Sequence, residues 1–163
     1  NRMRYPLEVF EAVRAAWPSD KPLGIRISAT DWIDGGWTVE ESVVFARELK
    51  SIGCDFIDVS SGALDPRQKI SLGPGYQVPF SAKIRTQAEI TTWTVGMITK
   101  ARQAEDIIAG GKADIVALAR GMRFDPRWAW HAAEELGVDT EYSRMYARCA
   151  PGQWPAVFPW RDK

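Results

Sequence analysis

The sequence predicts an α/β fold built from parallel βαβ units. Segments of helical periodicity alternate with four short apolar segments, and these predicted strands lie about 24 to 35 residues apart. Hydrophobic residues make up 45% of the 163 residues, which is enough for one core. Four parallel strands can form a small open doubly wound sheet or half of an eight-stranded barrel, and periodicity alone does not distinguish the two.

The first two predicted elements are a helix and a strand. Apolar residues recur at helical spacing from Tyr5 to Trp17, which predicts a helix. Residues Leu23 to Ser28 are predicted to form a strand, with Ile25 and Ile27 on one face and Arg26 on the other.

A capping box marks the second helix. Thr38 is its predicted N-cap and Glu41 stands at the third helical position, so each side chain can bond the other residue's backbone N–H. The helix is expected to run to about Ile52 and to end at Gly53. A strand over Asp55–Ser60 and a long Gly- and Pro-rich loop over Ser61–Pro79 follow.

The remaining elements complete four βα units within residues 1–137. In order, they are a helix over Phe80–Gln87, a strand over Ile90–Val95, a helix over Lys100–Ala109, a strand over Ala113–Leu118 and a helix capped by Asp125-Pro126 that ends at Leu136. Residues 138–163 are predicted to be an irregular C-terminal tail.

Composition excludes several function classes. Lys plus Arg (21) balances Asp plus Glu (21), so nothing suggests a nucleic-acid or membrane surface. Cys54 and Cys149 are too few for a disulfide framework and their spacing resembles no metal site, so no metal is expected. No signal peptide or apolar run long enough to span a membrane is present, and a cytoplasmic location is expected.

Two turns that follow predicted strands are the best candidates for ligand binding. Gly96 and Met97 follow one strand, and Ala119 and Arg120 follow the next, each ahead of a helix. Backbone N–H groups at such turns favour anions, and two adjacent turns after the last strands of a barrel can bind a phosphate. The structural alternative is a tight turn at Gly96 and a surface ion pair at Arg120.

Arg26 is the second candidate, because an arginine inside a strand is costly unless it is paired. It could face a ligand, or it could form a structural ion pair with Asp31 or Asp58. His131, the only histidine, lies within a helical run and is expected to have a surface or packing role.

Six segments, in order along residues 1 to about 137, resemble the Old Yellow Enzyme family of FMN oxidoreductases, in its thermophilic-like NADPH dehydrogenase branch. They are Asn1-Arg2-Met3-Arg4-Tyr5, Arg26 to Asp31, Asp58 to Leu64, Pro74-Gly75-Tyr76-Gln77-Val78, Val95 to Thr99 and Ala119-Arg120. The resemblance implies a TIM barrel, of which this chain would hold the C-terminal half, strands five to eight.

The resemblance also implies roles for five residues in FMN binding. Arg26 matches the arginine against the N1/C2 carbonyl edge of the flavin. Gly96 and Met97 match the seventh-strand turn on the phosphate. Ala119 and Arg120 match a phosphate-binding Gly-Arg pair, and the alanine should serve there if its φ is negative.

Near the tail, Tyr146-Ala147-Arg148 resembles a stretch whose arginine reaches into the active site of a neighbouring subunit. This similarity implies a homo-oligomer in which Arg148 contacts substrate in trans. The alternative is an arginine on a disordered tail.

The resemblance implies an oxidoreductase that takes hydride from NAD(P)H through FMN and reduces the C=C bond of small enone-type substrates. The family's substrate-anchoring pair and proton donor belong to the first four strands, so no catalytic residue is expected in this chain. The chain opens on Asn1 rather than Met, as though cut from a longer protein, and it is expected to be inactive alone. It would require the missing N-terminal half-barrel. The alternatives are a non-catalytic half-barrel that self-associates, or another phosphate-binding barrel enzyme.

Overall fold

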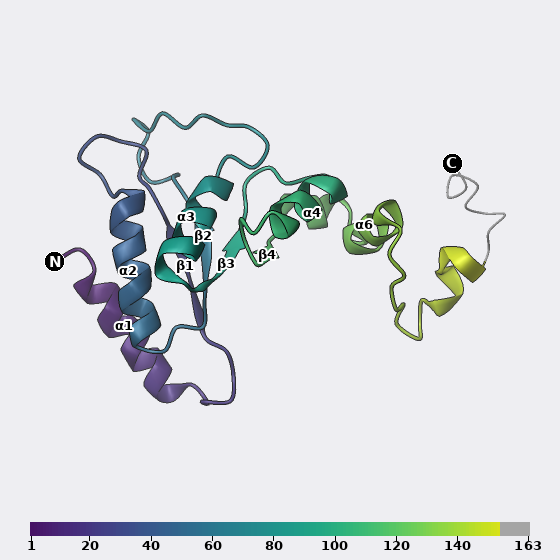
Figure 1. Cartoon of the computed structure of the whole chain (residues 1–163), viewed down its shortest axis with the longest axis horizontal. Coiled ribbons are helices and arrows are strands. Elements are labelled where there is room, and N and C mark those ends of the chain that lie inside the picture. The colour runs from purple at the N-terminus through teal and green to yellow at the C-terminus, as the bar shows by residue number, and fades with distance from the viewer. Residues whose placement is uncertain (154–163) are drawn as a thin grey trace. The chain divides into compact units, whose positions relative to one another are not determined.

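Four parallel strands form one sheet in the computed structural model of the chain, which describes residues 1–153 (Figure 1). The strands are β1 (Gly24–Ser28), β2 (Phe56–Ser60), β3 (Thr91–Thr94) and β4 (Ile115–Val116). The chain divides into two compact units. The larger unit contains residues 1–99 and 103–118, and the second contains residues 100–102 and the chain from 119 onward.

The strand order decides between the two architectures that the sequence left open. The sheet runs β1-β2-β3-β4, so each connection returns to the adjacent strand in the same direction. A doubly wound sheet instead reverses its strand order at a switch point, and these four strands show no reversal. The predicted parallel βαβ units are therefore confirmed, and the arrangement is consistent with part of a (β/α) barrel.

The helices alternate with the strands as the sequence predicts. They are α1 (Arg4–Ala16), α2 (Val39–Ser51), α3 (Val78–Ala88), α4 (Ala101–Ala109), α5 (Arg120–Phe124) and α6 (Trp128–Leu136), followed by 3-10 turns at Ala147–Cys149 and Pro151–Gln153. Helix α5 was not predicted. The predicted cap at Asp125-Pro126 is wrong: Asp125 precedes a proline, is extended and ends α5, and the N-cap of α6 is Arg127. The predicted tail over 138–163 is described only as far as Gln153, and the rest of it lies outside the described residues.

Apart from the start of α6, most element boundaries lie within one residue of the prediction, and two elements differ by more. Helix α3 begins two residues before the predicted Phe80, because Pro79 fits the first turn of a helix, where an N–H has no helical partner. Strand β4 is much shorter than the predicted Ala113–Leu118, because only Ile115 and Val116 pair with β3.

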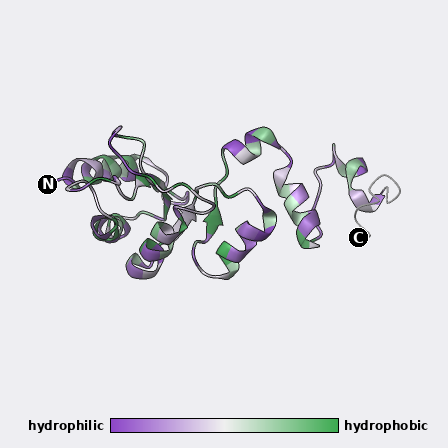
Figure 2. Ribbon diagram, turned by 90° about the horizontal axis from the view of Figure 1, so that it is seen from above, coloured by the Kyte–Doolittle hydropathy of each residue, from purple (hydrophilic) through white to green (hydrophobic). Residues whose placement is uncertain are grey.

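One face of the sheet forms the main core with the helices. Ile27, Ile57 and Val59 are buried there against apolar residues of three helices, which include Phe10 of α1, Leu49 of α2 and Ile84 of α3. The helices carry both hydrophobic and hydrophilic residues, as the colouring in Figure 2 shows. A second cluster joins Ile98, in the turn after β3, and Ile107 of α4 to Val116 of β4. Because α1 to α4 bury their apolar residues with this one face, the helices form a single layer.

The other face carries a different set of residues. Phe56 and Trp93 stack with their ring centroids 4.6 Å apart and their planes 9° apart. A Cβ on Gly24 would lie 2.4 Å from the Phe56 ring, so only glycine leaves room for this stack. Ile115, which lies opposite Trp93 in the pairing of β3 with β4, is 42% exposed. Phe56, Trp93 and Ile115 belong to neither buried cluster.

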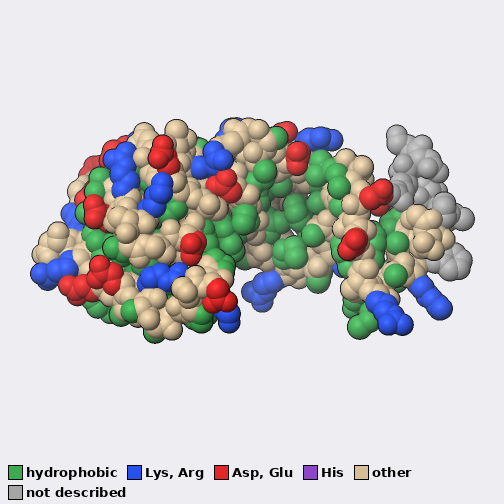
Figure 3. Space-filling view, turned by 60° about the horizontal axis from the view of Figure 1, so that its bottom comes forward, with side chains coloured by type: hydrophobic (Ala, Val, Ile, Leu, Met, Phe, Trp, Pro, Cys, Tyr) green, Lys and Arg blue, Asp and Glu red, His purple; other side chains and the backbone are tan. Residues whose placement is uncertain are grey.

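The surface of the larger unit mixes both signs of charge, as Figure 3 shows for one face, in keeping with the net charge of zero. Within residues 1–153, no helix is long and apolar enough to cross a membrane.

The capping box predicted at Thr38 is present and should stabilise α2. The Thr38 hydroxyl accepts from the Glu41 N–H at 3.2 Å, and the Glu41 carboxylate accepts from the Thr38 N–H at 2.9 Å. We expect Thr38→Ala to lower the free energy of unfolding by about 1 kcal/mol, measured by urea denaturation. Thr86→Ala, at an exposed site within α3, is the matched control and should not destabilise the protein. A loss as large in the control would contradict the capping role.

Cys54 is buried, and its thiol is protected. Burial raises the pKa of Cys54 to about 11, whereas Cys149 is exposed. Because the thiolate is the reactive form, we expect a thiol reagent at pH 8 to modify Cys149 rapidly and Cys54 only after unfolding. Because the folded chain holds this thiol protonated and the unfolded chain does not, the free energy of unfolding should fall as pH rises from about 9 toward 11. Rapid modification of both cysteines in the folded chain, counted by mass spectrometry, would contradict this assignment.

Candidate functional site

The predicted site residues are divided between the two units. Arg26, Gly96 and Met97 belong to the larger unit, whereas Ala119, Arg120 and Arg148 belong to the second. Arg26 lies in the middle of β1, and the Gly96–Met97 pair follows β3. Each unit is therefore described separately.

The turn after β3 has an uncommon backbone conformation. Gly96 has φ +110° and Met97 has φ +54°, so two successive residues lie at positive φ. A residue with a side chain would be strained at the Gly96 angle. The turn thus needs glycine at position 96, for the reason the sequence indicates.

Three successive backbone donors in this turn have no acceptor within the described residues. The N–H groups of Gly96, Met97 and Ile98 donate no hydrogen bond to residues 1–153. Ile98 is only 3% exposed. Gly96 is half-buried and Met97 is exposed, so the three donors run from the interior to the surface. Because nearly all buried N–H groups in proteins have a partner and successive N–H groups at such turns bind anions, these donors are suited to an external acceptor such as an anion.

Hydrogen bonds to neighbouring residues hold the same turn from its other side. The Gly96 carbonyl accepts from the Gly75 N–H at 2.8 Å. The Gln103 side chain accepts from the Thr99 N–H at 3.2 Å and donates to the Met97 carbonyl at 3.4 Å. The carbonyl groups are therefore used within the protein, while the N–H groups stay open.

Arg26 forms an ion pair with Asp58, one of the two carboxylates that the structural alternative named. These residues lie directly opposite each other in the parallel register, and Arg26 Nη1 is 2.5 Å from Asp58 Oδ2. The other candidate, Asp31, instead accepts from the Trp37 N–H at 2.7 Å.

The ion pair leaves part of the Arg26 guanidinium available. The side chain is 57% exposed, and among the described residues only its Nη1 has a hydrogen-bond partner. Asp58 is 15% exposed, and its second oxygen, Oδ1, is buried without a partner in the described chain. The pair can therefore hold a cation in place while other guanidinium donors remain free for a ligand.

Ala119 has the backbone angle that its predicted role requires. It is the N-cap of α5 with φ −96°, which alanine adopts without strain. Arg120, the first residue of α5, is exposed and makes no ion pair with any residue from 1 to 153. The surface ion pair that was its structural alternative is thus not seen in the described part of the chain.

Arg148 lies in the 3-10 turn Ala147–Cys149 and is exposed. No carboxylate within the described range pairs with it. Its reach into a neighbouring subunit remains a prediction.

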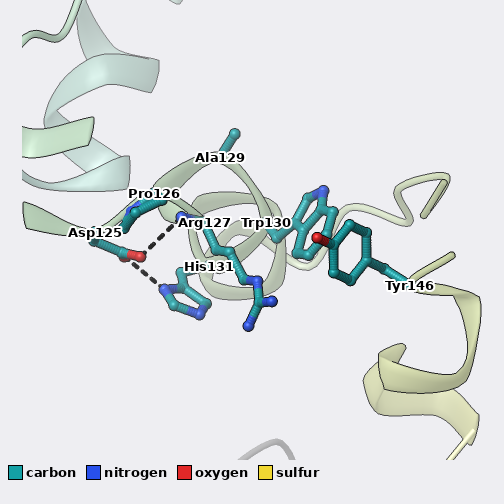
Figure 4. A pocket seen from close by; sticks show the side chains of 7 residues that line it. All are labelled: Asp125, Pro126, Arg127, Ala129, Trp130, His131 and Tyr146. Carbon is teal, nitrogen blue, oxygen red and sulfur yellow. Dashed lines mark hydrogen bonds and ion pairs between the residues drawn. The ribbon is translucent and has the colours of Figure 1, made fainter. Parts of the chain in front are cut away.

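The second unit contains a cavity of about 520 Å³ that the sequence did not predict (Figure 4). The Arg127 guanidinium lies over the rings of Trp130 and Tyr146, at 5.6 and 5.3 Å from their centroids. His131 Nδ1 lies 2.6 Å from Asp125 Oδ2, and its side chain is 67% exposed. His131 is therefore at the helix surface, as expected. Arg127 and Trp130 are three residues apart in the sequence, and at this spacing two side chains can contact each other on a helix surface.

Gln77 is a further residue to which the sequence assigned no role. It lies in the Pro74-Gly75-Tyr76-Gln77 segment, is 3% exposed and contacts the turn at Gly96. A polar residue in a long loop gives no sequence signal of burial, since loops are usually at the surface.

Comparison with known proteins identifies relatives for most of the chain. The NADH:flavin oxidoreductase / NADH oxidase family matches residues 1–139. An NADPH dehydrogenase of Geobacillus sp. (strain WCH70) is 48% identical over 148 residues, which is 91% of this chain and 43% of the relative. The NADPH dehydrogenases of Geobacillus thermodenitrificans and Bacillus subtilis are 45% and 40% identical, with the same coverage of 91% and 43%.

The chain thus spans less than half the length of these relatives, 43% in each case. The family match covers more than four fifths of the chain and includes Arg26, the Gly96–Met97 turn and Ala119-Arg120. The order and parallel pairing of the strands agree with it. We conclude that the chain belongs to the NADH:flavin oxidoreductase / NADH oxidase family.

Proposed function

We propose that this chain is the FMN-binding part of an NAD(P)H-dependent oxidoreductase that reduces activated C=C bonds. The observation that carries the proposal is the set of open N–H groups at Gly96, Met97 and Ile98. Family membership makes FMN the candidate ligand, and its phosphate is an acceptor of the right chemistry for these donors. The relatives' printed name, NADPH dehydrogenase, supports NAD(P)H as the reductant.

Ala119 and Arg120 are proposed to add donors for the FMN phosphate. A guanidinium offers a fork of N–H groups that matches two phosphate oxygens, and a charge-assisted bond of this kind is stronger than a neutral one. Arg120 has no competing ion pair within residues 1–153. The negative φ of Ala119 supports the view that its N–H can serve where relatives of this family use glycine.

Arg26 is proposed to contact the polar edge of the flavin ring. FMN supplies the hydride-transfer chemistry when bound. The Arg26 cation would stabilise negative charge on that edge, and Asp58 would hold the guanidinium in position. Because the pair is only partly buried, it can keep Arg26 oriented while solvent still reaches its other donors.

The residues that anchor and protonate substrate are proposed to lie outside this chain, in the part of the relatives that it does not match. Strands β1 to β4 would then be strands five to eight of a TIM barrel. Arg148 is proposed to contact the small enone-type substrate bound by a neighbouring subunit. On this proposal the chain binds FMN but does not turn over alone.

A second candidate function is a half-barrel that associates with another half-barrel without catalysing. Strands β1 and β4 are each paired on one side only. One sheet face carries the stacked Phe56–Trp93 pair and the exposed Ile115. Since parallel sheets are almost always covered on both faces, this arrangement favours a partner that covers the face and pairs the edges.

Selective loss of phosphate binding tests the first proposal. We expect Arg120→Ala to weaken FMN binding about tenfold, because it removes a charge-assisted contact, and to change riboflavin binding less than about twofold. Titration calorimetry with FMN and riboflavin measures both values. Arg123→Ala in the same short helix is the matched control and should change neither.

Equal weakening of FMN and riboflavin by Arg120→Ala would contradict the phosphate role. The same samples are assayed for NADPH oxidation with cyclohexenone as acceptor. Turnover by the 163-residue chain would contradict the proposal that its catalytic residues lie elsewhere.

The oligomeric state tests the second candidate. We expect the wild-type chain to sediment as a dimer or larger species, and Ile115→Lys to shift it toward the monomer because it places a charge on the uncovered face. Ile108→Lys is the matched control, since Ile108 is similarly exposed (38% against 42%) but lies on α4. A monomeric wild-type chain in analytical ultracentrifugation would exclude self-association.

A further inference from the structure

Gln77 connects the turn after β3 to the end of β2 through a buried amide. It is the N-cap of α3 and only 3% exposed. Its Nε2 donates to Ser61 Oγ at 2.8 Å and to the Ser61 carbonyl at 3.2 Å, with Ser60 Oγ at 3.4 Å. The amide is therefore fixed to the residues at the carboxyl end of β2.

Ser61 is itself held in place. It is 7% exposed, and its hydroxyl also accepts from Trp32 Nε1 at 2.9 Å. Trp32 lies in the loop after β1 at φ +55°, and its ring packs against Phe80 of α3 with centroids 5.3 Å apart. Buried polar groups that bond each other in this way define one arrangement, because any other leaves donors or acceptors unpaired.

Gly96 packs directly on Gln77. A Cβ at position 96 would lie 3.0 Å from Gln77 Oε1, 3.2 Å from Gln77 Cβ and 3.2 Å from Gln77 N. The Gly75 N–H, two residues before Gln77, donates to the Gly96 carbonyl at 2.8 Å. The turn thus rests on the backbone and side chain of Gln77, with its own N–H groups left open.

We propose that Gln77 is a positioning residue for the phosphate-binding turn, an inference that rests on the proposed FMN function. The amide end is fixed by Ser61 and the stem of the side chain lies against Gly96, so Gln77 determines how closely the turn can approach the end of β2. It acts through the turn and touches no ligand. Losing it would let the turn relax and would weaken the binding of a phosphate more than the binding of a flavin ring.

Three proteins test this role: the wild-type chain, Gln77→Leu and the matched control Gln87→Leu. Gln87 is exposed on the same helix, α3. Gln77→Leu should weaken FMN about tenfold and riboflavin less than about twofold, whereas the control should change neither. Hydrogen exchange on the ligand-free proteins should be faster in Gln77→Leu at the Gly75 and Thr99 amides, whose hydrogen bonds to the Gly96 carbonyl and the Gln103 side chain hold the turn, and should not change over β2.

The outcomes separate this inference from the proposed function. If the wild-type chain binds no flavin, the proposed function fails, and hydrogen exchange at the Gly75 and Thr99 amides still decides the role of Gln77. Unchanged exchange there in Gln77→Leu would overturn the positioning role. Equal weakening of FMN and riboflavin would also overturn it, because general destabilisation acts on both.

A second variant covers the case in which Gln77→Leu does not fold. Ser61→Ala removes the hydroxyl that accepts from the Gln77 amide at 2.8 Å but leaves Gln77 in place. It should shift exchange at the Gly75 and Thr99 amides and the ratio of FMN to riboflavin affinity in the same direction as Gln77→Leu, by a smaller factor. No change in either measurement would overturn the inference.

Discussion

The parallel register of four strands is the constraint on which the rest of the larger unit depends. It places Arg26 opposite Asp58 and Asp58 opposite Trp93, so residues far apart in sequence share one line across the sheet. It also brings the carboxyl ends of β1, β2 and β3 to one edge, where the loop residues Trp32 and Ser61 and the Gly96 turn can meet. The helices on the other face maintain this register by burying Ile27, Ile57 and Val59.

The strand ends are organised by polar contacts, whereas the core is organised by apolar burial. Gln77 and Ser61 are buried, and the Gln77 amide nitrogen and the Ser61 hydroxyl are joined by a hydrogen bond, whereas the N–H groups of Gly96, Met97 and Ile98 have no acceptor among the described residues. An apolar core tolerates exchanges of similar volume, but a buried amide specifies its partners. The open N–H groups therefore lie at the carboxyl ends of the strands, where polar contacts fix the loops, while Arg26 lies within β1.

The division of the chain into two units matches a division of chemistry. The larger unit supplies the open turn and the Arg26–Asp58 pair, and the second unit supplies Ala119, Arg120 and an aromatic cavity around Arg127. The relatives are more than twice as long as the segment matched here, since the matched region covers 43% of each. A site whose donors come from this chain and whose reactive groups come from elsewhere would explain why binding groups are plentiful here and no catalytic set was predicted.

The sequence by itself determined the alternation of four strands with helices (although not α5), the capping box at Thr38 and a turn at Gly96, because each depends on local backbone chemistry. It also identified Arg26 and Arg120 as candidate ligand-binding cations. Only the tertiary structure decided that Asp58 and not Asp31 pairs with Arg26, that the strands run in sequential order, and that Gln77 is buried under the Gly96 turn. These three depend on which distant segments become neighbours. Local propensity carries no information on that, since strand pairing and loop packing are set by contacts between residues tens of positions apart.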